Sequence, residues 1–253
     1  MPQFYLPGPW ETQKPTSLTP EVAHHLRVRR IQIGETFPVF DGKGQIAQAE
    51  LLSLGNKSGE ALLTEIQRDT HRETPYAITL AQGLAGGDKM DWIVEKAIET
   101  GAQNIAPLQC ERSVIKLSGP NNAERARKRL GHWQGIVQAA CEQCDRTVLA
   151  NIEPIQSFES YLQNPPTTSL KLLLSPEATV SMESILTEMP PQDIIVMIGP
   201  EGGHTPEEEA AAQIAGYQIV SLGARVLRTE TAGLVAISVV NTLWSPEIQK
   251  RLK

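Results

Sequence analysis

Two short, almost uninterrupted apolar runs constrain the fold of this chain more than any other feature. Residues 170–175 read Leu-Lys-Leu-Leu-Leu-Ser, and residues 194–199 read Ile-Ile-Val-Met-Ile-Gly. A strand with one face in water alternates apolar and polar side chains, whereas a strand inside a parallel sheet is buried on both faces and is apolar throughout. The two runs therefore predict central strands of a parallel sheet.

The segments around these runs alternate between strand and helix patterns. In the helix expected at 88–100, apolar residues recur every three or four positions, and Gly101 ends the pattern. Further strands are expected at 77–84, 104–110 and 218–222, and further helices at 122–144, 206–215 and 231–244. This alternation predicts an α/β fold in which helices connect parallel strands.

The first part of the chain has another pattern, of short strands separated by turns. Strands are expected at 32–40, 45–54 and 60–67. One helix is expected at 20–30, with Thr19 as its N-cap and Pro20 at its first position. We therefore predict two domains, a small β-barrel over residues 1–72 and the α/β domain over residues 73–253.

Charge and cysteine content exclude several classes of protein. The net charge is −6, which argues against coating nucleic acid through bulk charge, and three cysteines cannot form a disulfide framework. The first residues show no basic region followed by an apolar stretch, and no apolar run is long enough for a membrane span. We therefore expect no signal peptide and a cytoplasmic protein. Residues 112–146 carry seven basic and three acidic residues, either as a local phosphate-binding surface or as a solvated helix face.

A glycine-rich loop, Gly-Pro-Glu-Gly-Gly at 199–203, follows the second apolar run. Thr205 and Glu208 after it form the capping-box signature of a helix start. Ligands of open α/β sheets bind where such loops leave the carboxyl ends of strands. The loop lacks both phosphate-binding glycine signatures, and Glu201 would repel a polyphosphate. We expect either a ligand without phosphates, such as a cation, or a plain turn between strand and helix.

A second polar loop follows the strand expected at 218–222. Residues 221–233 contain two arginines, a glutamate and two threonines, more than a turn requires. We predict that this loop and the loop 199–203 lie at neighbouring strand ends and form one pocket.

These two loops resemble the paired signatures of the SPOUT methyltransferases, and more closely those of the RsmE family. The similarity extends over nearly the whole chain. It includes the first helix and the following strand of the second domain, an Ala-to-Arg motif, and a His-to-Arg motif near the N-terminus, at residues 88–101, 107–113, 140–146 and 24–30.

The resemblance implies both a fold and a reaction. The C-terminal domain is expected to be SPOUT-like, a parallel sheet with helices and a deep trefoil knot, and the N-terminal domain a PUA-like β-barrel that binds RNA. Members of the family use S-adenosyl-L-methionine to methylate N3 of one uridine in 16S ribosomal RNA, the RNA of the small ribosomal subunit. The resemblance also implies a homodimer.

The family's cofactor contacts can be carried over to the matching residues. They are expected at Leu174, Gly199, Glu201, Gly202, Gly203, Leu222, Gly223, Leu227, Arg228, Thr231 and Ala232. The resemblance and the basic residues together predict RNA contacts at His25, Arg27, Arg30, Arg112 and Arg146.

Methylation at N3 of a uridine needs removal of the N3 proton and stabilisation of the resulting anion. We expect Arg228, Arg112 or Arg146 to stabilise the anion, and Glu230 or Glu201 is a candidate base. N3 lies on the Watson–Crick edge, so the uridine must be unpaired or flipped out.

The sequence departs from the family pattern at two expected RNA-contacting sites. Arg29 stands where an apolar residue is usual, and Cys144-Asp145 replaces a serine-glycine pair. Cys141 and Cys144 lie on an apolar helix face without a second cysteine pair, so we expect them to pack in a core and expect no metal site.

The helix expected at 231–244 is apolar nearly all round, which predicts that a second subunit covers part of it. Two other functions remain open. One is a non-catalytic RNA-binding protein of the same fold, and the other is a SPOUT methyltransferase acting on another RNA or base.

Overall fold

The computed structural model describes residues 3–117, 122–164 and 170–245. The chain divides into two compact units, here called the N-terminal and the C-terminal unit. The N-terminal unit comprises Met1–Glu73 together with Gln138–Leu149, and the C-terminal unit comprises the remaining residues. The segment 138–149 lies outside the range 1–72 that was expected for the first domain. It contacts residues that are distant in the sequence, and local sequence patterns do not reveal such contacts.

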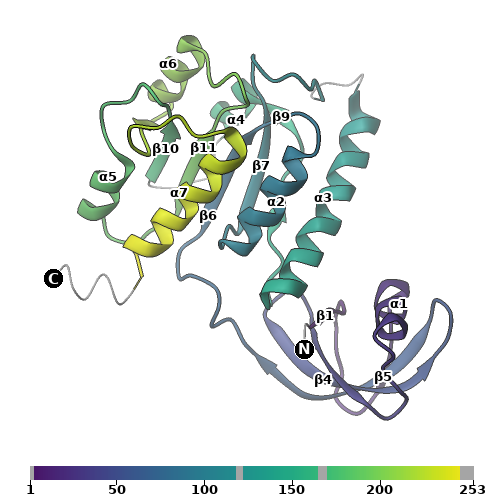
Figure 1. The fold of residues 1–253 in the computed structure, drawn as a ribbon. Helices are drawn as coiled ribbons and strands as arrows, with labels where there is room; N and C mark the ends of the chain where they lie inside the picture. Colours follow the sequence, from purple (N-terminus) through teal and green to yellow (C-terminus); the bar gives the residue numbers. More distant parts are fainter. Residues whose placement is uncertain (1–2, 118–121, 165–169, 246–253) are drawn as a thin grey trace. The chain divides into compact units, whose positions relative to one another are not determined.

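The N-terminal unit contains one five-stranded sheet, in the order β1-β3-β4-β5-β2. The long strands β4 and β5 pair in antiparallel register and curl strongly (Figure 1). In the described residues β1 and β2 form the two edges, so the sheet is curled like the expected barrel without being closed by their pairing. The strands are β1 (Phe4–Tyr5), β2 (Pro15–Ser17), β3 (Thr36–Phe40), β4 (Gln45–Leu54) and β5 (Gly59–Arg68).

The helix α1 (Pro20–Val28) covers the core of this sheet. Thr19 caps it by accepting a hydrogen bond from the Val22 N–H, and Pro20 occupies its first turn, as predicted. Such a cap contributes about 1 kcal/mol. Val22 and Leu26 are buried in the same hydrophobic core as Phe37 and Leu63 of the sheet.

The C-terminal unit is built on a parallel sheet in the order β12-β10-β11-β6-β7-β8, with β9 also paired to β7. All described pairings in it are parallel, which confirms the prediction from the two apolar runs. The strands are β6 (Ile78–Gly83), β7 (Asn104–Gln109), β8 (Asn151–Ile152), β9 (Gln156–Ser157), β10 (Leu170–Leu174), β11 (Ile194–Ile198) and β12 (Gln218–Val220). The trefoil knot stays a prediction.

Helices cover both faces of this sheet (Figure 1). The contacts of α7 with α2, α5 and β11 place these three helices on one face, and the contacts of α4 and α6 place them on the other. None of the described helices is both long and apolar enough to cross a membrane. The helices of the chain after α1 are α2 (Lys89–Glu99), α3 (Ala123–Cys144), α4 (Phe158–Gln163), α5 (Met182–Glu188), α6 (Pro206–Ile214) and α7 (Thr229–Leu243).

The expected strands and helices all appear, with shifts at their ends. The largest shift that affects the site is at α7, which begins at Thr229 instead of 231. Six elements had no prediction, namely β1, β2, β8, β9, α4 and α5. These are short, and a segment of two to seven residues shows too few repeats for periodicity to detect it.

Candidate active site

A cavity of about 560 Å³ opens at the carboxyl ends of β10, β11 and β12. The loops 199–203 and 222–228 line it, as predicted from their sequences. The two loops do not follow neighbouring strands, however, because β10 lies between β11 and β12. The end of β10 at Leu174 and the residues after it therefore form a third part of the lining.

The loop 199–203 is held in shape by its own backbone. Gly203 has a φ of +68°, which favours glycine, and its N–H donates to the Pro200 carbonyl at 2.9 Å. A Cβ atom at Gly199 would lie 2.9 Å from the Gly203 carbonyl carbon. A Cβ at Gly203 would meet no atom within 4 Å, so the backbone there faces open space in the cavity.

The helix that follows the loop begins with the predicted capping box. The Thr205 hydroxyl accepts from the Glu208 N–H at 3.1 Å, and Glu208 Oε2 accepts from the Thr205 N–H at 2.9 Å. Glu208 Oε1 also accepts from the Glu111 N–H at 2.8 Å. Burial opposes the negative charge, but the His204 ring, whose Nδ1 lies 3.6 Å from Glu208 Oε2, and the N–H groups of Glu111 and Thr205 hold the Glu208 pKa below its usual value. One buried carboxylate thus ties α6 to the loop after β7.

Arg112 was expected to contact RNA or the reacting base, and the structure gives it another contact. Its Nη1 donates to the carbonyl oxygens of Gly202 at 2.9 Å and of His204 at 3.1 Å. A Cβ at Gly202 would lie 3.0 Å from the Arg112 Cβ. Arg112 lines the cavity and holds the glycine loop in place through these two hydrogen bonds.

Glu201 is bound by groups from the loop before α2 and from the first residue of that helix. Its Oε1 accepts hydrogen bonds from the Gly86 N–H at 2.9 Å and from Lys89 Nζ at 3.0 Å. Partial burial opposes ionisation, but these two donors outweigh it and hold the Glu201 pKa below its usual value. Gly83 lets the loops approach, since a Cβ there would lie 2.5 Å from the Pro200 nitrogen.

The second loop joins the first through Thr229, a residue that was not predicted to belong to the site. The Thr229 hydroxyl donates to the Gly199 carbonyl at 2.6 Å and accepts from Gln82 Nε2 at 2.9 Å. Its position between Arg228 and Glu230, within the polar segment 221–233, could have indicated this role. Lys89 was not predicted either, because its partners Glu201 and Glu230 lie far from it in the sequence.

Ten of the eleven residues expected to contact the cofactor line the cavity. Thr231, one residue beyond Glu230, is not among the lining residues. Arg228 lines the cavity, but its side chain is 84% exposed. The ten are Leu174, Gly199, Glu201, Gly202, Gly203, Leu222, Gly223, Leu227, Arg228 and Ala232.

The remaining expected RNA contacts lie in the N-terminal unit. His25 and Arg30 are exposed, and Arg27 is partly exposed and donates to Asn56 Oδ1 at 2.8 Å. Arg146, by contrast, is only 4% exposed, and its Nε and Nη2 atoms pair with the two carboxylate oxygens of Glu73 at 3.0 and 2.7 Å. Removal of one partner of such a buried pair costs about 3–5 kcal/mol, which favours a structural use of Arg146.

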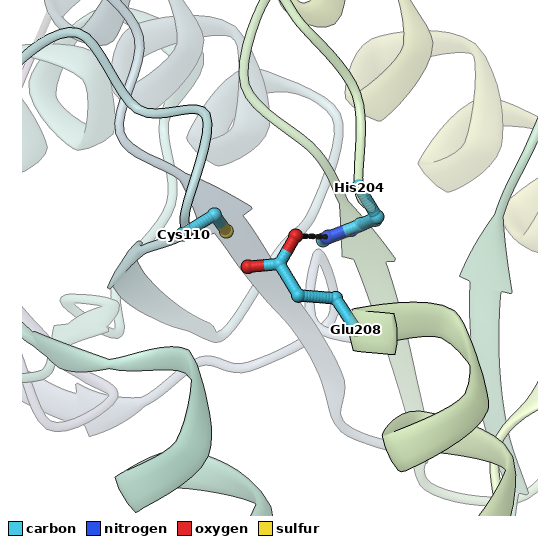
Figure 2. Close-up of side chains that lie close together, drawn as sticks. All are labelled: Cys110, His204 and Glu208. Atoms are coloured by element: carbon cyan, nitrogen blue, oxygen red, sulfur yellow. Dashed lines mark ion pairs between the residues drawn. The ribbon is translucent and has the colours of Figure 1, made fainter. Parts of the chain in front are cut away.

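Figure 2 shows the potential metal ligands that lie together in the described residues, Cys110, His204 and Glu208. His204 Nδ1 lies 3.6 Å from Glu208 Oε2. Both Glu208 oxygens already accept backbone N–H groups, and burial raises the pKa of the Cys110 thiol well above its usual value, which disfavours the thiolate that binds metals. Cys141 is fully buried and Cys144 partly buried, which agrees with packing in a core.

The chemistry of the cavity fits S-adenosyl-L-methionine. Apolar side chains and open glycine backbone suit an adenosine group, and carboxylates suit a sulfonium cation. The apolar side chains are Leu174, Ile198, Leu222, Val226, Leu227 and Ala232, and the carboxylates are Glu177, Glu201, Glu209 and Glu230.

The chain is similar to proteins of known sequence and structure over most of its length. Residues 72–241 match a family described as an RNA methyltransferase domain, and residues 18–64 match one described as an RNA methyltransferase PUA domain. The ribosomal RNA small subunit methyltransferase E of Bacillus subtilis is 31% identical to it, over 89% of each chain.

Two solved structures resemble the fold closely. The ribosomal RNA small subunit methyltransferase E of Neisseria gonorrhoeae, bound to S-adenosyl methionine, is 38% identical with a TM-score of 0.87, over 96% of this chain and 98% of that one. A methyltransferase from Legionella pneumophila in complex with S-adenosyl methionine is 30% identical with a TM-score of 0.88, over 95% of this chain and 97% of that one.

Proposed function

Because the chain belongs to the family of ribosomal RNA small subunit methyltransferases E, we propose that it methylates N3 of a uridine in 16S ribosomal RNA, with S-adenosyl-L-methionine as the donor. The observation that carries this proposal is the cavity between the loops 199–203 and 222–228. The Neisseria relative, which binds S-adenosyl methionine, supports the choice of cofactor. The choice of uridine N3 rests on the resemblance of both loops to the RsmE family.

Different residues of the cavity would hold different parts of the cofactor. When bound, S-adenosyl-L-methionine supplies an electrophilic methyl group on a sulfonium cation. The backbone of Gly199–Gly203 and the side chains of Leu174, Leu222 and Leu227 would enclose its adenosine part. Positioning of this kind accounts for a large share of catalysis when two reactants must meet in line.

Glu230 is the better of the two candidate bases. Glu201 already accepts two hydrogen bonds and has a lowered pKa, so it binds a proton poorly. Glu230 lines the cavity, and its Oε2 is buried without a hydrogen-bond partner in the described residues. We assign it the role of taking the N3 proton.

RNA binding is assigned to the N-terminal unit, which contains the matched PUA domain. His25, Arg27 and Arg30 would contact phosphates there, which position an RNA without reading its bases. We assign Arg112 to the support of the glycine loop and Arg146 to the pair with Glu73.

We also propose a homodimer, through the exposed side of α7. An apolar cavity of about 600 Å³ lies between this helix, the start of α5 and the end of β12. A second copy of the chain suits it because the surface is continuous with the cofactor loop at Leu222 and Gly223, so the partner would complete the site. Its apolar lining consists of Met182, Leu222, Leu234, Val235, Val239 and Leu243.

Mass spectrometry of nucleosides tests the proposal. Small-subunit RNA from cells that lack this protein is incubated with the purified protein and S-adenosyl-L-methionine at near-neutral pH, as in the cytoplasm. We expect 3-methyluridine at one position. Cofactor binding with a methyl group on another base or on transfer RNA would favour the second alternative, and absence of cofactor binding would favour a non-catalytic RNA-binding protein.

A further inference from the structure

Lys89, the first residue of α2, holds a central place at the cavity. Its Nζ donates to Glu201 Oε1 at 3.0 Å and lies 4.0 Å from Glu230 Oε2, and the side chain is 39% exposed. Glu201 belongs to one loop of the cavity and Glu230 to the start of α7. The ammonium group is therefore held by the glycine loop and lies beside the start of α7.

The other cations that line the cavity are used differently. Arg112 Nη1 is engaged by two backbone carbonyl oxygens. Arg225 is exposed, and the Arg228 side chain is 84% exposed with its nearest carboxylate oxygen 4.0 Å away. The Lys89 ammonium has three N–H donors and gives one to Glu201, so two remain. Among the described lining residues, Lys89 is the cation that is held by a hydrogen bond and also lies within 4.0 Å of Glu230 Oε2, an oxygen without a hydrogen-bond partner there.

Glu230 supplies a hydrogen-bond acceptor next to the Lys89 donor. Its Oε2 is buried and has no hydrogen-bond partner in the described residues, and a buried carboxylate oxygen without a donor is costly. Nζ of Lys89 is too far away for a hydrogen bond to it, yet near enough for both groups to contact adjacent atoms of one ligand edge. The pair therefore presents a donor beside an acceptor.

An imide base such as uracil matches this pair, because its N3–H lies between two carbonyl oxygens. We propose that Lys89 is a catalytic residue, whose ammonium donates a hydrogen bond to a carbonyl oxygen beside N3 while the Glu230 carboxylate takes the N3 proton. This inference rests on the proposed function. The electron pair left on N3 forms the bond to the methyl carbon as the carbon–sulfur pair returns to sulfur, and the proton on Glu230 then passes to water.

The Lys89 ammonium would make the N3–H group of the bound uracil more acidic. Loss of the N3 proton spreads negative charge onto the two carbonyl oxygens, and a fixed donor at one of them stabilises the anion. Without Lys89 the bound base would release its proton only at higher pH, so the rate should continue to rise to higher pH than in the wild type.

Single-turnover methylation of small-subunit RNA across a pH series tests this role in Lys89→Met and Lys89→Arg. Lys96→Met is the matched control, because Lys96 lies on the same helix, pairs with Glu95 and Glu99, and does not line the cavity. We expect Lys89→Met to be about 100-fold slower at neutral pH, with its pH profile moved upward and its cofactor affinity by calorimetry within a few-fold of the wild type. Lys89→Arg should recover most of the rate.

A modified substrate separates this role from a structural one. Fluorine at C5 of the target uridine makes N3 more acidic, so the deficit of Lys89→Met should shrink on that RNA. If Lys89→Met instead loses cofactor affinity in proportion to rate, with an unchanged pH profile, Lys89 only holds Glu201 and the inference is wrong. If the wild type binds the cofactor but makes no 3-methyluridine, the proposed function fails first and this inference falls with it.

Discussion

The glycine loop 199–203 and the loop 222–228 face the same cavity but are held in place by different means. Arg112, Thr229 and the Glu201 contacts bind the first loop to three other segments. Residues 223–227 make no hydrogen bond with any other part of the described chain, and Val226 is 77% exposed. The first wall of the cavity, the loop 199–203, is therefore held in shape without a ligand. The second wall, the loop 222–228, depends on the ligand for its contacts. Changes in the first wall should cost more affinity than changes in the second.

The largest effect is expected from Gly199→Ala. The new Cβ would meet three backbone atoms of residues 203 and 204 at 2.9–3.0 Å, so the loop must open. Overpacking of this kind costs about 1–3 kcal/mol, and calorimetry should give a cofactor affinity reduced by about 10- to 100-fold. Gly131→Ala in α3, where a Cβ meets nothing within 4 Å, is the control and should leave affinity unchanged. Equal affinity in a folded Gly199→Ala would refute the shape assigned to this wall.

Arg112→Met should come next, with a cofactor affinity lower by about tenfold. The change keeps most of the stem but removes both hydrogen bonds to the loop carbonyls. Arg112 is exposed, so we take the lower end of the range of about 1.5–3 kcal/mol for hydrogen bonds to a charged group. RNA affinity from filter binding should stay the same, as in the exposed control Arg125→Met. A loss of RNA affinity with intact cofactor binding would return Arg112 to its first predicted role.

Glu208→Gln should have a smaller effect, mainly on stability and its pH dependence. The lowered pKa of Glu208 contributes stability that is present above the ordinary value of about 4.3 and is lost as pH falls through the lowered folded value. We expect the variant to lose about 1–2 kcal/mol near neutral pH and to show a weaker decline in acid. The exposed neighbour provides the control, Glu207→Gln, in thermal unfolding at several pH values. Parallel pH curves for the wild type and Glu208→Gln would contradict this use of the carboxylate.

Arg225→Ala should have the smallest effect, within about twofold in cofactor affinity. The side chain is exposed and forms no ion pair in the described structure, and surface changes of this kind stay within about 0.5 kcal/mol. Calorimetry alongside Arg112→Met gives the contrast directly. A tenfold loss at Arg225 would show that the second wall is as fixed as the first.

The sequence predicted those features that depend on local pattern. The parallel strands came from apolar runs, and the capping box of Thr205 and Glu208 came from spacing alone. The partners of Arg112 and Arg146 could not be predicted, because they lie 90 and 73 residues away and only the folded chain brings them together. Their charge and the family resemblance predict that both arginines contact RNA, and that role stays a prediction. The same limit hid Lys89, whose meaning depends on Glu201 and Glu230.

Hydrogen–deuterium exchange with and without S-adenosyl-L-methionine tests the account of the cavity most directly. We expect the cofactor to slow exchange strongly in residues 223–227, where the backbone has no hydrogen-bond partner in the described chain, and only moderately at Gly203, whose N–H already donates to the Pro200 carbonyl. Protection confined to other segments, or no change in either loop at saturating cofactor, would contradict the assignment of this cavity as the cofactor site.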